Sequence, residues 1–429
     1  MSRSPVRFFK SVSQRVVFSL EQFSRHEMAN HAAAGAYAFL LSAIPAVLVI
    51  LFVSSRVLGT LDSGLVLGVL DPIIAVFGGR EAIASFVSTP LAGFTGAFGV
   101  VNLLWAARLF IVSMQRGMRI VYADGAKVNP VRENALTFAV EIILILAIVL
   151  IISASQVARA AIGAIHWKPM ARLLGLAVSL GLHAFPTLAL WLFVFLTYKN
   201  VPPVKPRAVN AAIGSAACLV TYTALGALLS LTLNTARYGL LYGILGNLII
   251  GLIKVYFFFW LYFFFAELCH TLENFDSMLF ARFHRLAMSD KPAKGLDRTL
   301  FSNPARLIRR YAREYSAGET IFEKGDDDRS ALYLYRGSVE IGLPPAAGEA
   351  GAVLSTVGEG ELFGEMAWLL EEPRSARAVA KTDCMVFVLP PEMFERYLAQ
   401  DAGASRRLVE LMAARLKANN ERVGRSGER

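Results

Sequence analysis

The chain has 429 residues, of which 55% are hydrophobic and 18% are charged, and its formal net charge is +10. Residues 1–290 carry 22 Lys or Arg against 12 Asp or Glu, whereas residues 291–429 carry 21 of each sign. The first part has too few charges for a water-exposed surface, and the second has ordinary globular composition. This excludes a single soluble domain and a disordered chain, and it favours membrane-embedded segments over nucleic-acid binding as the reason for the basic excess.

Six predominantly apolar stretches follow one another in the first part, each close to the roughly 20 residues that a helix needs to cross a membrane. The predicted spans are 33–53, 92–114, 136–155, 173–197, 209–233 and 241–268. Residues 57–80 are also apolar, but Gly, Asp and Pro interrupt them, and we expect a re-entrant or interfacial hairpin there. The predicted fold of this part is an all-α six-helix transmembrane bundle.

Basic residues are unevenly divided between the segments that join the spans. The N-terminal arm and the second and fourth loops hold 12 Lys or Arg, and the loops on the opposite side hold 6. Positively charged loops stay in the cytoplasm, so both termini are predicted to lie there. No short apolar region with a cleavage site precedes the first span, and we expect no cleaved signal peptide.

Polar side chains within spans are candidates for function because each is costly in hydrocarbon. Those singled out are Asn102, Arg108, Glu141, His183, Lys254 and Glu267. Arg108 and Glu141 lie at matching depths, so they can pair, whereas His183 and Lys254 fall near the midplane. Two interpretations stay open: a structural ion pair with a histidine bonded to a neighbouring helix, or a polar path for a solute or proton.

Several anchors in the apolar part resemble a known membrane family. The segment HAAAGAYAFLLSAIP at 31–45, Leu104-Trp105 followed by Arg108, and the glycines near 243 with Phe-Ala-Glu267-Leu resemble the first, second and sixth spans of the YihY/BrkB family. The resemblance covers about 20–280 and implies six helices in a bacterial inner membrane. It also implies a transport-like role for which no substrate is established.

Catalytic and metal-binding patterns are missing from the sequence. Some members of that family carry a ribonuclease label, but metal-dependent hydrolysis needs clustered His and Asp ligands, and the 6 His show no such spacing. The 3 Cys are scattered and predict neither a zinc site nor a disulfide. We therefore expect no enzyme and no metal.

From Leu300 onward, short runs of β-forming residues alternate with turns that contain Gly. The predicted strands lie at 320–323, 331–335, 338–341, 352–356 and 385–389. Such regular short strands are typical of an antiparallel sandwich or barrel. Helices are predicted beside it at 303–313 and at 405–421.

The segment ELFGEMAWLLEEPRSARAVA at 361–380 closely resembles the phosphate-binding cassette of cyclic nucleotide-binding domains, and 318–337 resembles their opening strands. The resemblance implies a β-roll (jelly-roll-like) domain of the cAMP-receptor type with cAMP or cGMP as regulatory ligand and no cofactor. The candidate binding residues are Phe363, Gly364, Glu365, Met366, Ala367, Arg374, Ser375 and Ala376.

The residue types of this cassette suit a cyclic phosphate. Gly364 opens a short helix and lets the backbone approach the anion, and Arg374 can hold it by a charge-assisted, bidentate bond. The resemblance implies that Glu365 accepts the ribose 2′-hydroxyl and that Ser375, with Ser in place of Thr, favours cAMP. Two alternatives remain open: Glu365 caps a helix, or Arg374 pairs with Glu371 or Glu372.

The expected organisation is a cytoplasmic arm (1–30), a six-span membrane domain (31–280), a linker (281–297) and a cyclic nucleotide-binding domain with a C-terminal helix (298–429). No helix-turn-helix follows, so a transcription factor is not expected. We expect an inner-membrane protein, a transporter regulated by cAMP, whose partners are the bilayer and the nucleotide, with homo-oligomerisation open. The alternatives are a non-transporting scaffold and a cyclic-nucleotide-gated channel, although the sequence lacks a selectivity filter.

Overall fold

The structure is a computed structural model of the whole chain. It describes residues 5–42, 109, 112–122, 184, 187–232, 244–289, 292, 295–344, 353–400, 403–406, 408–410 and 412–413. The chain forms two compact units, one made of Met1–Phe18 with Asn274–Arg429 and the other of Ser19–Glu273. The first 18 residues therefore belong with the C-terminal part of the chain rather than with the membrane-like part.

The unit Ser19–Glu273 is helical wherever it is described in long segments. It contains α8 (Ala208–Thr232) and most of α10 (Ile244–Ala287), together with helical segments at 28–42, 112–121 and 187–200. Among the described residues, two helices are long and apolar enough to cross a membrane, Ala208–Leu229 and Ile249–Ala287. The first lies within the predicted fifth span, and the second overlaps the predicted sixth span but continues beyond its predicted end at 268. The predicted span at 136–155 and the hairpin at 57–80 lie outside the described residues.

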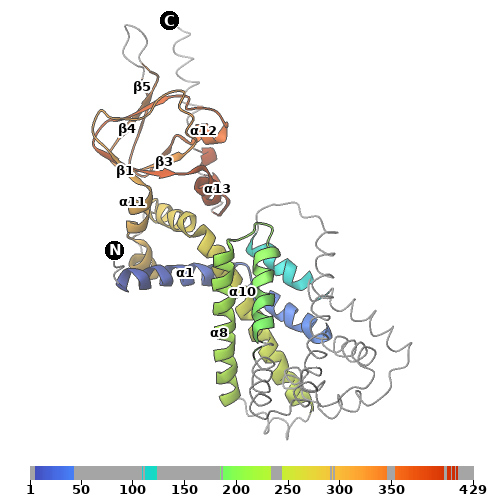
Figure 1. Cartoon of the computed structure of the whole chain (residues 1–429). Helices are drawn as coiled ribbons and strands as arrows, with labels where there is room; N and C mark the ends of the chain where they lie inside the picture. Colours follow the sequence, from blue (N-terminus) through green and yellow to red (C-terminus); the bar gives the residue numbers. More distant parts are fainter. Residues whose placement is uncertain are drawn as a thin grey trace, which may run out of the picture. The chain divides into compact units, whose positions relative to one another are not determined.

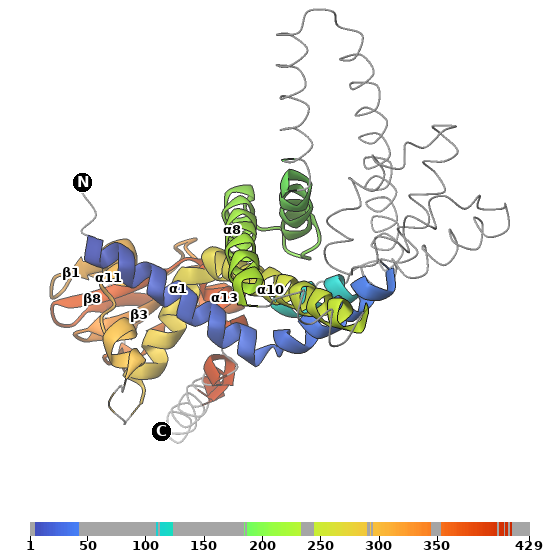
Figure 2. The ribbon, with the colours of Figure 1, turned by 90° about the horizontal axis from the view of Figure 1, so that it is seen from below.

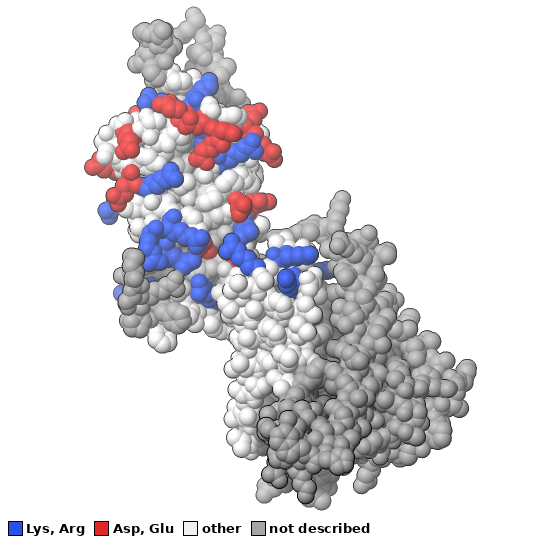
Figure 3. Space-filling model, in the orientation of Figure 1, with Lys and Arg blue, Asp and Glu red and all other residues white. Residues whose placement is uncertain are grey.

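Small residues let the helices of this unit pack closely on α10, beside which α8 runs in Figures 1 and 2. A Cβ added to Gly214 of α8 would lie 2.2 Å from the Cys269 sulfur, and one added to Gly117 would lie 2.3 Å from the Phe263 ring. Close approach through small residues is the packing mode of membrane helices. The opposite side of α8 exposes Val209, Ile213 and Val220, and the surface of α8 in Figure 3 shows no Lys, Arg, Asp or Glu.

The C-terminal part of the other unit is a β-roll of two antiparallel four-stranded sheets. The first has the order β1 (Ala312–Tyr315), β8 (Cys384–Leu389), β3 (Ala331–Arg336), β6 (Leu362–Phe363). The second has the order β2 (Thr320–Phe322), β7 (Arg377–Ala380), β4 (Val339–Gly342), β5 (Val353–Val357). The five predicted strands are confirmed, and β1, β6 and β7 are additional. Alternate side chains of both sheets, such as Leu334, Val339 and Val386, form the core between them.

Helices cover the outer face of the first sheet. They are the end of α10, a π-helical turn (Asp297–Phe301), α11 (Ala305–Tyr311) and α13 (Pro391–Gln400). Helix α1 (Pro5–Arg25) packs through Phe18 on α10 and on the π-helical turn. A second core of aromatic and aliphatic side chains joins these helices to β3 and β8. The helix predicted at 303–313 is confirmed as α11, which ends where Ala312 becomes extended and pairs with Phe387. The sequence did not predict α13, and of the predicted helix 405–421 the described residues up to 413 are helical.

Candidate functional site

The predicted cassette forms a strand, a left-handed glycine and one short helix. β6 ends at Phe363, Gly364 has φ of 71°, and α12 (Glu365–Leu369) begins directly after it. A Cβ on Gly364 would lie 2.7 Å from both Nη1 of Arg374 and Cδ1 of Leu332. Glycine is therefore favoured at position 364 for two reasons. Residues with a side chain are strained at this positive φ, and the Arg374 guanidinium occupies the space that a Cβ would need.

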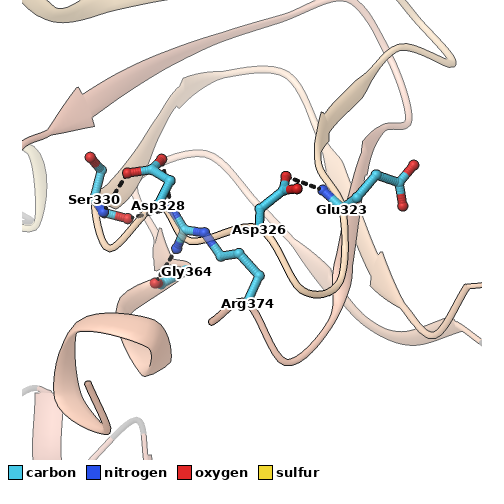
Figure 4. A network of polar contacts seen from close by, with 6 residues as sticks. All are labelled: Glu323, Asp326, Asp328, Ser330, Gly364 and Arg374. Atoms are coloured by element: carbon cyan, nitrogen blue, oxygen red, sulfur yellow. Dashed lines mark hydrogen bonds and ion pairs between the residues drawn. The ribbon is translucent and has the colours of Figure 1, made fainter. Parts of the chain in front are cut away.

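Arg374 lies in a fixed position at the centre of the site, as Figure 4 shows. Its side chain is 3% exposed, and Nη1 donates to the Gly364 carbonyl at 2.5 Å. Nη2 donates to the Ser330 carbonyl at 2.7 Å and to the Asp328 carboxylate at 3.1 Å. The guanidinium also lies over the Phe322 ring, 4.4 Å from its centroid. Four contacts from three parts of the chain thus orient one cation.

The backbone of Arg374 is held by the turn that follows β2. The Arg374 N–H donates to the Asp326 carbonyl at 2.9 Å, and the Gly325 N–H donates to the Arg374 carbonyl at 2.8 Å. The Asp326 carboxylate in turn accepts from the Glu323 N–H at 2.8 Å and closes that turn (Figure 4). These bonds connect two segments about 50 residues apart in sequence, so the site exists only in the folded roll.

The carboxylate that pairs with Arg374 is Asp328, and among the described residues neither Glu371 nor Glu372 forms the alternative pair. Burial lowers the pKa of Arg374, and the Asp328 charge opposes that effect. Partial burial raises the pKa of Asp328, but hydrogen bonds from Ser330 and the Arg374 charge outweigh it and hold this pKa below its ordinary value. Both groups therefore stay charged at neutral pH.

Sequence reasoning missed Asp328 and Ser330. The available signal was the run of three Asp at 326–328 directly after Gly325, a turn placed between two predicted strands. Only the folded structure shows that, of these three carboxylates, the one of Asp328 pairs with Arg374.

The described contacts leave donors of Arg374 for an anion, Nε among them. Nε is buried and makes no hydrogen bond to any described residue, in contrast to Nη1 and Nη2. A buried cation with an unused donor is costly unless it receives a partner, and a phosphate oxygen is the partner that Arg binds best. The arrangement suits capture of a small anion beside Gly364.

The remaining cassette residues range from fully buried to exposed. Phe363 and Glu365 are fully buried, and Ala367 is 3% exposed. The Phe363 ring stacks on Phe322 with centroids 6.3 Å apart, which connects β6 to the ring beneath Arg374. Met366 and Ala376 are half-buried and Ser375 is exposed. The N-cap of α12 is Gly364, which has no side chain to cap the helix, and the alternative that Glu365 acts as a cap stays open.

The structure places only two of the predicted intramembrane residues. Asn102, Arg108, Glu141 and His183 lie outside the described residues, so both interpretations of them stay open. Lys254 is half-buried on α10. Glu267 is fully buried, and its Oε1 lies 2.6 Å from Nδ1 of His26. Within the described residues, no three His, Cys, Asp or Glu are grouped as a metal site would require.

Comparison with known proteins gives a match for each half of the chain. The family model described as virulence factor BrkB matches residues 19–282, and the model described as cyclic nucleotide-binding domain matches 312–401. The confirmed resemblances therefore place the Gly364–Arg374 site inside the second match.

Similar curated proteins match the C-terminal part. Glutaminase 1 of Bradyrhizobium diazoefficiens is 37% identical over 26% of this chain and 18% of its own length. The cAMP-activated global transcriptional regulator CRP of Salmonella typhimurium is 28% identical over 27% of this chain and 54% of its own. The crystal structure of Thermus thermophilus catabolite activator protein is 29% identical and covers 28% of this chain and 56% of its own, with a TM-score of 0.25. The chain thus spans about half or less of the relatives it matches, and by its match over residues 19–282 it belongs to the virulence factor BrkB family, in which it carries an additional cyclic nucleotide-binding domain.

Proposed function

We propose that this chain is a six-span inner-membrane protein, a transporter, whose conformation is controlled by a cyclic nucleotide bound beside Arg374. The observation that carries the proposal is the buried, fully oriented guanidinium with its unused Nε. Its position next to Gly364 suits a cyclic phosphate, and the purine and ribose then extend over the cassette. Both termini lie in the cytoplasm in this proposal, as the distribution of Lys and Arg between loops favours.

The ligand proposed is cAMP ahead of cGMP. Ser375 is exposed at the site and replaces the Thr that the family resemblance associates with cGMP. Two similar proteins, a transcriptional regulator and a protein kinase regulatory subunit of Colletotrichum orbiculare, are both named for their dependence on cAMP. The second protein is 34% identical over 22% of this chain and 23% of its own length.

Coupling to the membrane half is proposed to run through α10. This helix is continuous from Ile244 to Ala287, and its last residues, including Phe275 and Phe280, lie in the same core as Tyr333 of β3 and Phe394 of α13. A nucleotide changes the membrane half only if it binds one conformation better, and such coupling is typically about 1–3 kcal/mol. Movement of the roll then acts directly on the helix that carries Lys254.

The first test is calorimetric titration of cAMP and cGMP into the full chain in lipid nanodiscs. We expect micromolar or tighter binding of cAMP, weaker binding of cGMP, and loss of both in Arg374→Ala. Arg313→Ala is the matched control, because Arg313 is an exposed arginine of β1, the edge strand opposite β6 in the first sheet. Absence of binding to the folded wild-type chain contradicts the proposal.

The second test separates a transporter from a scaffold and from a channel. Proteoliposomes are loaded with candidate solutes, and flux is followed with and without cAMP. A scaffold gives nucleotide binding without flux, and a channel gives conductance that single-channel recording resolves. Catalytic turnover of any tested substrate would contradict the expectation that the protein is no enzyme.

A further inference from the structure

The carboxylate of Glu267 is buried with only one of its two oxygens paired. Its side chain is 0% exposed among the packed helices of the unit Ser19–Glu273. Oε1 lies 2.6 Å from Nδ1 of His26, whereas Oε2 accepts no hydrogen bond from any residue that the structure describes. A buried carboxylate in this condition is costly unless a positive charge or a proton neutralises it. His26 is the partner that can supply either.

His26 is the member of the pair that reaches the surface. Its side chain is 22% exposed, and imidazole is the side chain whose charge changes between about pH 5 and 8. When one proton is bound beyond the neutral ring and the carboxylate, the pair has no net charge, whichever partner carries that proton. When the proton leaves to water, the ring is neutral and Glu267 keeps an uncompensated negative charge. The contact is therefore favoured at lower pH and disfavoured as the pH rises.

The other charged groups around the pair have contacts or positions of their own. Glu27 accepts at Oε2 from Nδ2 of Asn30 at 3.1 Å. The Tyr122 hydroxyl donates to a backbone carbonyl of α10 at 3.5 Å. Among the described residues, only the His26 ring bonds to the buried carboxylate. The remaining titratable groups on the elements packed around it are Arg25, Arg116, Arg119, Tyr198, Cys218, Cys269, His270 and Glu273.

His31 is a second histidine near the end of α1. Its ring packs edge to face on Phe263, with the centroids 6.3 Å apart. Burial lowers the pKa of His31, Glu27 opposes this effect, and Arg116 adds to it. Its charge therefore changes in more acidic solution than the charge of an ordinary histidine. This difference makes His31 a suitable control for His26.

The pair lies on the two helices through which the chain passes between its two units. These passages fall between Phe18 and Ser19 in α1 and between Glu273 and Asn274 in α10. His26 directly follows the last residue of α1, where the chain turns at Glu27 with φ of 52°. A bond that depends on a proton thus holds the end of one connecting helix to the other connecting helix.

We propose that His26 and Glu267 form a proton-binding site that holds the end of α1 on α10 and releases it when the proton is lost. The site makes the connection between the two units responsive to pH. The ligand is a proton, so the inference goes beyond the proposed function and requires neither cAMP nor a transported solute.

The test follows the mobility of a nitroxide on Ser24→Cys in the full chain in nanodiscs, between about pH 5.5 and 8.5. Ser24 is exposed and lies two residues before His26. Ile213→Cys, at a position of α8 that is 52% exposed, is the reference in the same unit. The three native cysteines are buried, which leaves the introduced thiol as the reactive one. Solid-state NMR of the chain with 15N-labelled histidine reports ring protonation in parallel, and the His26 signal is the one lost in His26→Gln.

We expect the label at 24 to shift from an immobile to a mobile spectrum as the pH rises, over the same interval in which His26 loses its proton. The label at 213 should not change. Glu267→Gln should abolish the pH response, because no buried charge is then left uncompensated, and His31→Gln should retain it.

A label at 24 whose mobility is independent of pH overturns the inference, and so does a response that persists in Glu267→Gln. If Glu267→Gln does not fold, the wild-type chain still decides, because a mobility change that does not coincide with the titration of His26 also contradicts the site. No nucleotide and no flux enter these measurements. Their failure therefore leaves the proposed function as it stands, and absence of cAMP binding leaves the proton site as it stands.

Discussion

Nδ1 of His284 lies 2.7 Å from the hydroxyl of Tyr397, so the last turns of α10 are hydrogen-bonded to α13 of the nucleotide-binding unit. His284 is 3% exposed and stacks on Phe280, while its ring meets that of Tyr333 edge to face at 5.3 Å. On the same side of α13, the Phe394 ring lies 6.0 Å from that of Tyr397 and 5.2 Å from that of Trp368 of α12. Packed side chains thus connect the helix of the cassette to the helix that continues from the predicted sixth span.

Tyr397→Phe should destabilise this unit by about 1–2 kcal/mol, because it leaves a buried imidazole nitrogen without the phenol partner. Tyr335→Phe is the matched control, since the hydroxyl of this half-buried tyrosine makes no hydrogen bond to a described residue. Urea unfolding of the full chain, followed by near-ultraviolet circular dichroism, measures both variants. Equal midpoints for Tyr397→Phe and Tyr335→Phe would show that the His284 bond adds no stability.

Tyr397→Phe should weaken the effect of cAMP on the membrane half more than it weakens the binding of cAMP. Tyr397 lies away from Arg374, so the affinity for cAMP is expected to change by less than about threefold, whereas the effect of cAMP on flux or conformation of the membrane half falls. Calorimetry beside a conformational label on α8 separates the two quantities. An unchanged nucleotide effect contradicts coupling through this bond.

Arg374→Ala should weaken cAMP binding more than Asp328→Ala does. Arg374→Ala removes the charge-assisted bonds to phosphate and should weaken cAMP binding at least roughly 100-fold, equivalent to about 2.7 kcal/mol. Asp328 is 57% exposed in its side chain and orients Arg374 together with two carbonyl groups, so Asp328→Ala should weaken binding only several-fold. If the two variants bind equally poorly, Asp328 contacts the ligand itself.

Gly364→Ala should abolish nucleotide binding while the roll stays folded. The new Cβ would lie 2.7 Å from Nη1 of Arg374 and must displace it. Gly360→Ala is the matched control, because Gly360 also has positive φ, 90°, but has no atom within 4 Å of the added Cβ. Both variants should lose about 1–2 kcal/mol of stability from backbone strain, and only Gly364→Ala should lose affinity. Equal cAMP affinities of Gly364→Ala and Gly360→Ala would show that displacement of Arg374 does not affect nucleotide binding.

Cys384 should react slowly with a water-soluble maleimide in the native protein. It is 5% exposed at the start of β8, and burial raises the pKa of its thiol. Because thiolate is the reactive form, raising the pH from 7 to 8 should leave the native rate far below that of the denatured chain. Mass spectrometry of the labelled peptide measures the rate. Labelling as fast as in denaturant would place Cys384 at an open edge of the roll.

Local patterns in the sequence were sufficient for the elements that depend on neighbouring residues. The strands at 331–336 and 384–389 have consecutive β-forming side chains, and Gly364 and Arg374 are recognisable from the cassette motif alone. The two long apolar helices follow from composition, because hydrocarbon disfavours charge and each of them contains a long, predominantly apolar stretch.

Helix α13 and strand β1 could not be found in this way. α13 has only 10 residues and starts at Pro391, and β1 consists of four residues that directly follow a helix. Each is stabilised by partners distant in sequence: Phe394 and Tyr397 by α10 and α12, and Ala312 by Phe387. Their formation is a consequence of packing rather than of local preference.

The sequence by itself determined that a charge-poor helical part precedes a β-roll and which residues make up the cassette motif, because composition, periodicity and a short motif are properties of neighbouring residues. Only the tertiary structure decided that Asp328 pairs with Arg374 and that His284 of α10 bonds to Tyr397. These relationships join residues 46 and 113 positions apart. Their energies arise from burial and hydrogen bonding that do not exist until the chain has folded.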